Sequence, residues 1–400
     1  MAKYKVLRII NRLNLGGPTY NVTFLTRFIS EDYETVLIAG MKDASEASST
    51  FILDQYGVNA TLIPDMHRSI HPVKDWKAFW HIYKIIKKEK PDIVHTHAAK
   101  AGFLGRLVAS YCKVPVIIHT YHGHVFNGYF GALKTKVFLF LERYLAKKSS
   151  KLIALSYQQK EELVNTYKIC PSEKMEILNL GFDLDKYQED YTRKRVSFRN
   201  KFLIEEDEIA IGIIGRLVPI KNHRLFFDAL EIVLNKTQKK VKAIIVGDGE
   251  LKKELIEYVR GKGLDFVDAL KETKKATITF ASWQQEIDWV NAGLDIVALS
   301  SNNEGTPVSL IEAQASGNPI ISTNVGGIKD IVKVNETALL SAVGAAEPFA
   351  QNMLKLIEDK ALRAQMKDKG RHVFRQFSYK RLCQDMELLY LKEMHKLNEN

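Results

Sequence analysis

The stretch that decides the fold runs through Ile296-Val297-Ala298-Leu299-Ser300, Ser301-Asn302-Asn303-Glu304-Gly305-Thr306-Pro307 and Val308-Ser309-Leu310-Ile311-Glu312-Ala313-Gln314-Ala315-Ser316-Gly317-Asn318-Pro319. An apolar run enters a polar turn, and a second apolar segment follows. We expect Thr306 to cap a helix and Pro307 to take its first position, where a missing N–H costs nothing. Gly317 then ends the helix. The stretch predicts strand, loop, short helix and strand.

Two carboxylates flank the start of this helix. Glu304 lies in the loop, and Glu312 lies about a turn and a half into the helix. The free N–H groups of the first turn form an anion site between them. A phosphate on those amides, with carboxylates holding the hydroxyls of a sugar and a ribose, is the layout of a nucleotide-sugar site. On the spacing alone, a solvated loop acid and a surface helix acid explain the pair equally well.

Residues 304–307 and 312–319, followed by Val325-Gly326-Gly327 and Asp330, closely resemble the signature of glycosyltransferase family 4. The resemblance covers most of the chain. It implies retaining enzymes with the GT-B fold, in which two Rossmann-like domains face each other across a cleft. In that family the first glutamate lies near the donor sugar and the second binds the ribose. The residues that the resemblance therefore brings to the donor are Glu304, Gly305, Thr306, Pro307, Val308 and Glu312.

Strands alternate with helices along the whole chain, which predicts an α/β protein with parallel sheets. We expect an acceptor-side domain over residues 1–187 and a donor domain over residues 188–377. The resemblance implies that the last helix, at about 378–400, crosses back to the first domain. Ligands of such sheets bind at the carboxyl ends of the strands.

The loop after the strand at 209–214 reads Gly215-Arg216-Leu217-Val218-Pro219-Ile220-Lys221-Asn222. An arginine and a lysine five residues apart can converge on a diphosphate, one as a bidentate fork and the other as a point charge. The segment also resembles the family's diphosphate-binding pair, so we expect Arg216 and Lys221 to act in catalysis. By the same resemblance, Gly247 and Trp283 border the donor. For Trp283 the alternative is simple packing.

In the first domain, Gly16 and Gly17 stand in a strand–helix turn where backbone can approach a ligand closely. In the resembled family this loop faces the donor diphosphate and the acceptor. His122 lies in a His-Gly segment that also resembles the family, where the matching histidine reaches the donor near the transferred sugar; we expect that catalytic role for His122, and His124 is a second candidate. A packed, hydrogen-bonded core histidine is the alternative.

No metal is expected. His95 and His97 end a predicted strand, but two histidines without a third ligand indicate structural roles or acceptor contacts. Asp183-Leu184-Asp185 matches a metal-binding Asp-x-Asp, yet it falls where the resembled family has its interdomain linker. We therefore expect neither a metal nor another cofactor, with the nucleotide-sugar acting as a substrate.

The net charge of +11 points to an acidic partner. No nucleic-acid motif accompanies it, so we expect no nucleic acid. Residues 1–187 carry roughly nine more basic than acidic side chains. We predict docking on an anionic membrane or a phosphorylated acceptor, with a solvated basic face as the alternative. The lysines assigned to this docking are Lys134, Lys136, Lys147, Lys148 and Lys151, together with Lys84, Lys87 and Lys88.

Scattered cysteines at 112, 170 and 383, odd in number, argue against a disulfide framework or a zinc site. The chain enters a strand-like segment without a signal-peptide apolar region, and no apolar run is long enough to cross a bilayer. We expect a cytoplasmic protein, with peripheral attachment to the inner face of the membrane as a further prediction.

The predicted function is retaining transfer of a sugar from a nucleotide diphosphate donor to a glycan acceptor on a lipid or a surface polysaccharide. By family frequency the donor is a UDP-sugar, with a UDP-N-acetylhexosamine as one candidate. Two alternatives stay open. A non-hydrolysing nucleotide-sugar epimerase shares the architecture but needs protein acid and base groups. A non-catalytic module for glycan or membrane binding would leave the donor motifs unexplained.

Overall fold

The computed structural model describes residues 4–13, 16–41, 49–67, 69–122 and 132–398. His124 and the glycine beside it lie outside the described residues. Among those residues, no helix is long and apolar enough to cross a membrane.

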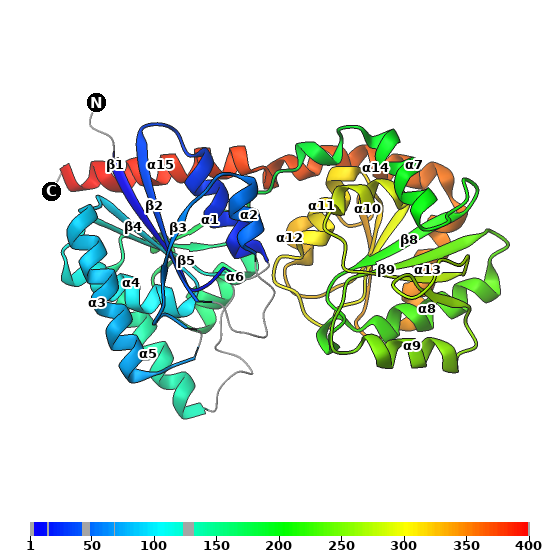
Figure 1. The fold of residues 1–400 in the computed structure, drawn as a ribbon, viewed down its shortest axis with the longest axis horizontal. Helices are drawn as coiled ribbons and strands as arrows, with labels where there is room; N and C mark the ends of the chain where they lie inside the picture. The colour runs from blue at the N-terminus through cyan, green and yellow to red at the C-terminus, as the bar shows by residue number, and fades with distance from the viewer. Residues whose placement is uncertain (1–3, 14–15, 42–48, 68, 123–131, 399–400) are drawn as a thin grey trace. The chain divides into compact units, whose positions relative to one another are not determined.

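The chain divides into two compact units (Figure 1). The first unit is Met1–Phe182 with Gln376–Asn400, and the second is Asp183–Arg375. The junction therefore lies five residues before the expected boundary at 187/188. The reason is local: the single-turn helix Asp185–Tyr187 packs its tyrosine against the second unit.

A parallel sheet of seven strands forms the centre of the first unit, in the order β3-β2-β1-β4-β5-β6-β7. Most residues of its strands are buried, as a sheet covered on both faces requires. The strands are β1 (Tyr4–Ile10), β2 (Tyr33–Gly40), β3 (Ala60–Ile63), β4 (Ile93–His97), β5 (Val116–Thr120), β6 (Lys151–Ala154) and β7 (Met175–Ile177).

Helices cover both faces of this sheet (Figure 1). On one face, Ile82 and Leu104 pack on Leu7 and Val94. The helices of the unit are α1 (Gly17–Phe28), α2 (Thr50–Gln55), α3 (Pro72–Glu89), α4 (Ala99–Tyr111), α5 (Ala132–Lys148), α6 (Tyr157–Glu161) and α15 (Tyr379–Asn398).

Helix α15 packs on the opposite face of the same sheet, beside α1. Leu382 and Met386 of α15 share a core with Val6 and Ile118. The two places where the chain leaves and re-enters this unit lie side by side, because the Phe182 N–H donates to Phe377 and the Tyr379 N–H donates to Phe182. The last helix thus belongs to the first unit.

The second unit has its own parallel sheet of seven strands, in the order β10-β11-β9-β8-β12-β13-β14. The expectation of two parallel-sheet Rossmann-like domains is confirmed. The strands are β8 (Ile209–Ile214), β9 (Val241–Val246), β10 (Phe266–Asp268), β11 (Ile278–Ser282), β12 (Ile296–Leu299), β13 (Ile320–Thr323) and β14 (Ala338–Ser341).

Aromatic and aliphatic side chains of α8 and α13 pack on one face of this sheet, including Phe227 and Met353 against Ile211 and Ile245. The helices of the unit are α7 (Tyr191–Lys201), α8 (His223–Lys236), α9 (Lys252–Gly261), α10 (Ile287–Gly293), α11 (Val308–Ser316), α12 (Ile328–Ile331), α13 (Ala346–Glu358) and α14 (Lys360–Val373). Helix α7 was not expected, because its sequence is polar and carries no clear apolar period. It packs on α10 through Phe198, whose ring fills the space a side chain at Gly293 would need.

Candidate active site

Arg216, Lys221 and the predicted donor residues from 304 to 312 gather where the neighbouring strands β8 and β12 end. Backbone and side chains join the two following loops: the Asn302 N–H donates to the Ile220 carbonyl at 2.8 Å, and the Ser300 hydroxyl donates to the Lys221 carbonyl at 3.0 Å. Because these strands are parallel, both loops leave the same edge of the sheet. The structure therefore brings the cationic loop and the Glu304 loop together.

Within this edge, Lys221 and Glu304 form an ion pair, with Nζ 2.5 Å from Oε1. The Ser301 hydroxyl donates to the same carboxylate oxygen at 2.6 Å. The Glu304 side chain is only 10% exposed, so its charge is held in one place. Arg216, in contrast, is exposed and has no side-chain hydrogen bond or ion pair to any described residue. Its guanidinium is available to a ligand.

Glycines let the loops of this edge approach one another. A Cβ at Gly326, where φ is +50°, would lie 1.7 Å from the Glu304 carbonyl oxygen. The next amide, of Gly327, donates to that carbonyl at 3.2 Å. A Cβ at Gly247 would lie 1.9 Å from the Gly215 carbonyl oxygen. Both positions need a residue without a side chain, since neighbouring backbone occupies the space.

Helix α11 begins one residue later than expected. Pro307, with φ −71° and ψ 105°, is the extended residue before the helix, and Val308 is its first residue. The prediction that Thr306 caps the helix is wrong, because no side chain caps it. Gly317 ends it in the left-handed conformation at φ +79°, as expected. In the first turn the Leu310 N–H donates to the Pro307 carbonyl at 3.1 Å, whereas the N–H groups of Val308 and Ser309 have no carbonyl within the helix to bond with.

Glu312 stands on α11 and is half-buried. The Tyr187 hydroxyl donates to its Oε1 at 2.7 Å. Burial raises the pKa of Glu312 to about 7 and nearby Asp288 adds to this, whereas the Tyr187 hydrogen bond and the charge on Lys186 oppose it. Sequence reasoning missed Tyr187. The only available signal was an aromatic residue in a polar linker.

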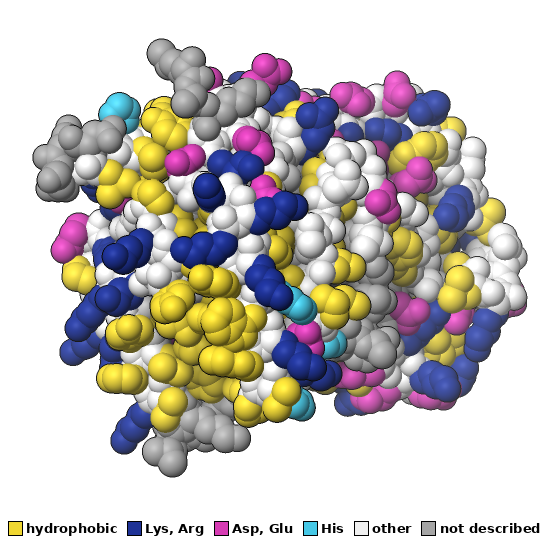
Figure 2. Space-filling model, turned by 60° about the vertical axis from the view of Figure 1, so that its left-hand side comes forward, with side chains coloured by type: hydrophobic (Ala, Val, Ile, Leu, Met, Phe, Trp, Pro, Cys, Tyr) yellow, Lys and Arg dark blue, Asp and Glu magenta, His cyan; other side chains and the backbone are white. Residues whose placement is uncertain are grey.

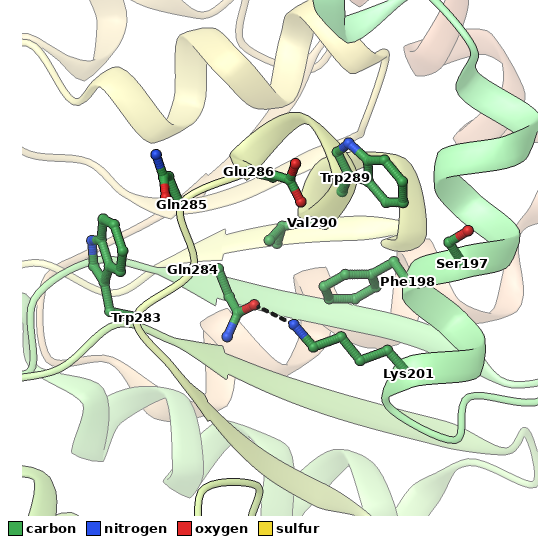
Figure 3. Close-up of a pocket in the computed structure, with 9 residues that line it drawn as sticks. All are labelled: Ser197, Phe198, Lys201, Trp283, Gln284, Gln285, Glu286, Trp289 and Val290. Carbon is green, nitrogen blue, oxygen red and sulfur yellow. Dashed lines mark hydrogen bonds between the residues drawn. The ribbon is translucent and has the colours of Figure 1, made fainter. Parts of the chain in front are cut away.

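Trp283 lies after β11, at the mouth of a pocket of about 540 Å³ in the second unit (Figure 3). Figure 3 shows the pocket between that loop and α7, with the Lys201 ammonium donating to Gln284 at 2.9 Å. The Trp283 ring is half-exposed. Neither the Lys221–Glu304 pair nor Glu312 lines this pocket. The role of Trp283 at the donor stays a prediction.

In the first unit, histidines gather where β4 and β5 end. The His97 Nδ1 and the His122 Nε2 are hydrogen-bonded at 3.0 Å. Gly16 and Gly17 start α1 after the neighbouring strand β1, with Gly16 at φ +151°. Burial lowers the pKa of His122 to about 3, so its ring is neutral near pH 7. The predicted role of His122 at the donor is not tested by this geometry.

His95 and His119 have structural roles. His95 is hydrogen-bonded to the Tyr390 hydroxyl at 2.7 Å and to the Thr120 hydroxyl at 2.8 Å, and His119 to the Thr96 hydroxyl at 2.9 Å. Burial, reinforced for His95 by the charge of Arg8, holds the pKa of each well below 6.5. Tyr390 comes from α15, and no local sequence signal links it to β4.

Asp183 and Asp185 lie at the start of the second unit, where Asp185 opens the single turn that carries Tyr187. In the described part of the chain, no three His, Cys, Asp or Glu side chains converge so that they could hold a metal ion. Lys151, assigned to docking, is buried and bonded to Glu176 at 2.9 Å, so that assignment is wrong. Lys151 is the first residue of strand β6, and its side chain turns inward to pair with Glu176 on the neighbouring strand β7. Nothing is described of the Lys134 side chain.

Two family models match the chain. The model for glycosyltransferase family 4 matches residues 16–186, and that for glycosyl transferases group 1 matches residues 194–373. Together they span both units. The chain belongs to the glycosyltransferases of family 4, and its fold is GT-B.

Among curated relatives, the chain is similar to the UDP-Gal:alpha-D-GlcNAc-diphosphoundecaprenol alpha-1,3-galactosyltransferase of Escherichia coli, with 29% identity over 84% of each chain. It is also similar to the capsular polysaccharide biosynthesis glycosyltransferase CapM of Staphylococcus aureus, with 26% identity over 84% of this chain and 86% of CapM. Among solved structures, Anabaena HepE in complex with UDP has a TM-score of 0.79 and 18% identity, over 97% of this chain and all of HepE.

Proposed function

We propose that this glycosyltransferase moves a hexose or N-acetylhexosamine from a UDP-sugar to a lipid-linked glycan, with retention at the anomeric carbon and without a metal ion. The observation that carries the proposal is the edge of the second sheet, where Arg216 and the Lys221–Glu304 pair meet on adjoining loops. UDP is favoured because the Escherichia coli relative uses UDP-Gal by its name.

Departure of the diphosphate is the step that this edge would assist. Negative charge develops on the leaving oxygens, and donors fixed in advance stabilise it without reorganising. Arg216 offers a bidentate fork, Lys221 a point charge, and the start of α11 free amides. Glu304 holds Lys221 in position before the donor binds. When a diphosphate binds, the Lys221 ammonium turns toward it. The Glu304 carboxylate then becomes free to accept hydrogen bonds from sugar hydroxyls.

The resemblance of residues 304–319 to the signature of glycosyltransferase family 4 supports the proposal of retention. In this proposal the acceptor attacks the face from which the diphosphate leaves, and a donor phosphate oxygen takes the acceptor proton. The protein then needs no strong base.

The test is a donor panel containing UDP-galactose, UDP-glucose and UDP-N-acetylglucosamine, with release of UDP measured in the presence of a diphosphoundecaprenol-linked acceptor. Transfer with one donor and an α product from an α donor, read from the anomeric coupling in proton NMR, would support the proposal. Inversion of the anomeric centre would overturn retention. Product formation from donor alone, as an epimer, would favour an epimerase.

The acceptor is proposed to be lipid-linked because the Escherichia coli relative, by its name, acts on GlcNAc-diphosphoundecaprenol, and CapM, by its name, takes part in capsular polysaccharide biosynthesis. Such an acceptor places the reaction at a membrane surface. We therefore propose peripheral attachment of the enzyme to the inner face of the cytoplasmic membrane.

A further inference from the structure

An aromatic cluster lies on the outside of the first unit. Its five rings lie on α3 and at the end of α4, and neighbouring ring centroids are 5.2–6.4 Å apart. The rings belong to Trp76, Phe79, Trp80, Tyr83 and Tyr111. Trp76 is 62% exposed and Tyr111 67% exposed. Figure 2 shows apolar side chains gathered on this side of the unit, with lysine and arginine around them.

Helical spacing explains why these rings face outward. Trp76, Trp80, Tyr83 and Lys87 recur at intervals of four, three and four residues, so they fall on one face of α3. The buried residues of α3, Ala78, Ile82 and Ile86, take the opposite side and meet the sheet. The two tryptophans are not needed to pack α3 against the sheet, so their position on the surface needs another explanation.

Apolar exposure continues on α5, which adjoins α4 in the same layer of helices. Phe140 is 68% exposed, and Val137 and Tyr144 are about half-exposed. Together the aromatic cluster and these three residues form what we call the aromatic face. Large apolar patches rimmed by polar residues mark interaction surfaces on soluble proteins.

The charge around the aromatic face is of one sign. Helices α3, α4 and α5 contain three acidic residues, and each of them is held by a cation. Asp75 pairs with Lys100 at 2.5 Å, Glu89 with Lys5 at 3.0 Å, and Glu142 with Arg106 at 2.8 Å. The exposed lysines of these helices are Lys74, Lys77, Lys84, Lys87, Lys88, Lys136, Lys147 and Lys148.

We infer that the aromatic face docks on an anionic lipid bilayer, with Trp76 and Trp80 entering the headgroup region and the surrounding lysines binding lipid phosphates. Tryptophan and tyrosine favour the membrane interface because their rings are apolar and carry a polar handle. A helix with apolar rings and a basic flank has the character of an interfacial element. The surface deepens the function proposed above, since it would hold the enzyme where a lipid-linked acceptor lies.

The observations favour a bilayer over a protein partner. The lysines are spread around the rings rather than gathered at one point, which suits a surface with many equivalent anions. One of them, Lys87, has its Nζ 5.7 Å from the centroid of the Tyr83 ring. Lysine side chains also reach outward while their stems stay on apolar surface. Each lysine near an anionic membrane raises the partition coefficient about fivefold, so a few produce reversible binding.

The test is co-sedimentation of the full chain with vesicles of phosphatidylglycerol and phosphatidylcholine, free of acceptor. We expect binding to anionic vesicles, little binding to phosphatidylcholine alone, and weakening as salt screens the charges. The double substitution Trp76→Ser and Trp80→Ser should reduce the partition coefficient more than tenfold. Replacing the same two residues by Phe should restore much of it.

Matched variants isolate the two contributions. Charge reversal at Lys77, Lys84 and Lys87 should weaken binding by at least about a hundredfold, taking about fivefold for each lysine. Reversal at Lys239, Lys253 and Lys271, exposed lysines of the second unit, changes the net charge equally and should have little effect. Leu270→Ser, at an exposed apolar residue of the second unit, is the control for lost apolar area.

Depth is measured by fluorescence in a chain carrying Trp283→Phe and Trp289→Phe, so that only Trp76 and Trp80 emit. Blue-shifted emission, quenched by brominated lipids, would support insertion. No sedimentation with anionic vesicles at low salt would overturn the inference, as would unchanged binding by the Trp→Ser variant. A wild-type dimer that the same variant converts to a monomer would make the face a subunit interface instead.

Failure here is distinguishable from failure of the proposed function. Vesicle binding requires no donor and no transfer. Transfer to a water-soluble acceptor, lacking the lipid, should proceed at the same rate in the Trp76→Ser and Trp80→Ser variant as in the wild type.

Discussion

The carboxyl edges of the two sheets differ in their chemistry. At the edge of the second unit, a half-buried cation and carboxylate pair at 2.5 Å and Arg216 stands exposed. At the edge of the first unit, buried neutral histidines bond to one another or to hydroxyls, as in the His97–His122 pair. Among the described residues, the edge of the second unit thus carries a charged pair, and we call it the charged edge, whereas neutral histidines lie at the edge of the first unit.

The difference indicates a division of labour. A cation such as Lys221, which can exchange its carboxylate partner for a ligand, suits an anionic donor. Coulomb interactions are strong at such a place because water is partly excluded. Neutral hydrogen-bonding rings suit hydroxyl groups and add no repulsion.

Removing the cations of the charged edge should have the largest effect. Arg216→Ala and Lys221→Ala should each lower kcat by about a hundredfold, because loss of one preorganised charge at a leaving group costs roughly 3 kcal/mol. Steady-state UDP release measures this, and circular dichroism checks the fold. Lys253→Ala, on the exposed surface of α9, is the matched control. Rates near wild type in both active-site variants would contradict the diphosphate assignment.

Filling the loop contact at Gly326 should come next. Gly326→Ala forces a Cβ against the Glu304 carbonyl and adds about 1–2 kcal/mol of left-handed backbone strain. We expect weaker UDP-sugar binding by calorimetry and a lower thermal midpoint. Gly261→Ala, where a Cβ meets open space, should leave both unchanged. Normal donor affinity in Gly326→Ala would show that the position of Glu304 does not matter.

Substitutions at the two glutamates of the charged edge should affect different ligands. Glu312→Gln should weaken binding of free UDP, whereas Glu304→Gln should spare UDP and weaken the UDP-sugar. Their different partners motivate this, since Glu312 is held by Tyr187 and Glu304 by Lys221. Titration of both ligands into both variants decides it. Equal loss of UDP affinity in the two variants would contradict the separation.

Nucleotide affinity should depend on pH through Glu312. Its raised pKa, about 7, leaves the carboxyl partly protonated at neutral pH, and the charged form is the better acceptor for ribose hydroxyls. Affinity for UDP should therefore fall as pH falls, about tenfold between pH 8 and pH 6. Tyr187→Phe removes a bond to the charged form and should move the profile to higher pH. Glu312→Gln should flatten it.

The histidines of the first unit should not contribute to this pH dependence. Burial holds the pKa of His97 and of His122 far below this range, so these two histidines should contribute no titration. If the Glu312→Gln variant kept the full pH dependence, another group would be responsible and the assignment to Glu312 would be wrong.

The smallest expected effect is that of a chelator. Activity should survive EDTA, because in the proposed mechanism Arg216 and Lys221 supply the positive charge at the diphosphate, and the Asp-x-Asp pair lies at the junction of the units. UDP release is measured before and after dialysis against EDTA. Complete loss of activity, restored by magnesium or manganese, would overturn the metal-independent mechanism.

The element order could be predicted from the sequence. The alternation of strands and helices predicted two parallel sheets, and the last helix implied at about 378–400 is α15, Tyr379–Asn398. These patterns are local, and each repeats the spacing of its own element. The candidate donor loops followed for the same reason, because Arg216, Lys221, Glu304 and Glu312 stand in short contiguous motifs.

The predictions from sequence were wrong where contacts with residues distant in the chain determined the local structure. Polar α7 folds because Phe198 packs against Gly293, and Lys151 is buried because Glu176 lies on the adjoining strand. The start of α11 moved by one residue, since Pro307 adopts an extended conformation. Local propensity is a weak prior in such cases, because tertiary contacts override it.

By itself, the sequence determined two α/β units, their parallel sheets and the motifs at the ends of β8 and β12. Only the tertiary structure decided that Tyr187 holds Glu312 across 125 residues, that Lys221 rests on Glu304, and that the tryptophans of α3 face outward. The physical reason is that periodicity shows which residues share a face. Which face meets the sheet, and which polar groups pair across loops, depends on elements far away in the chain.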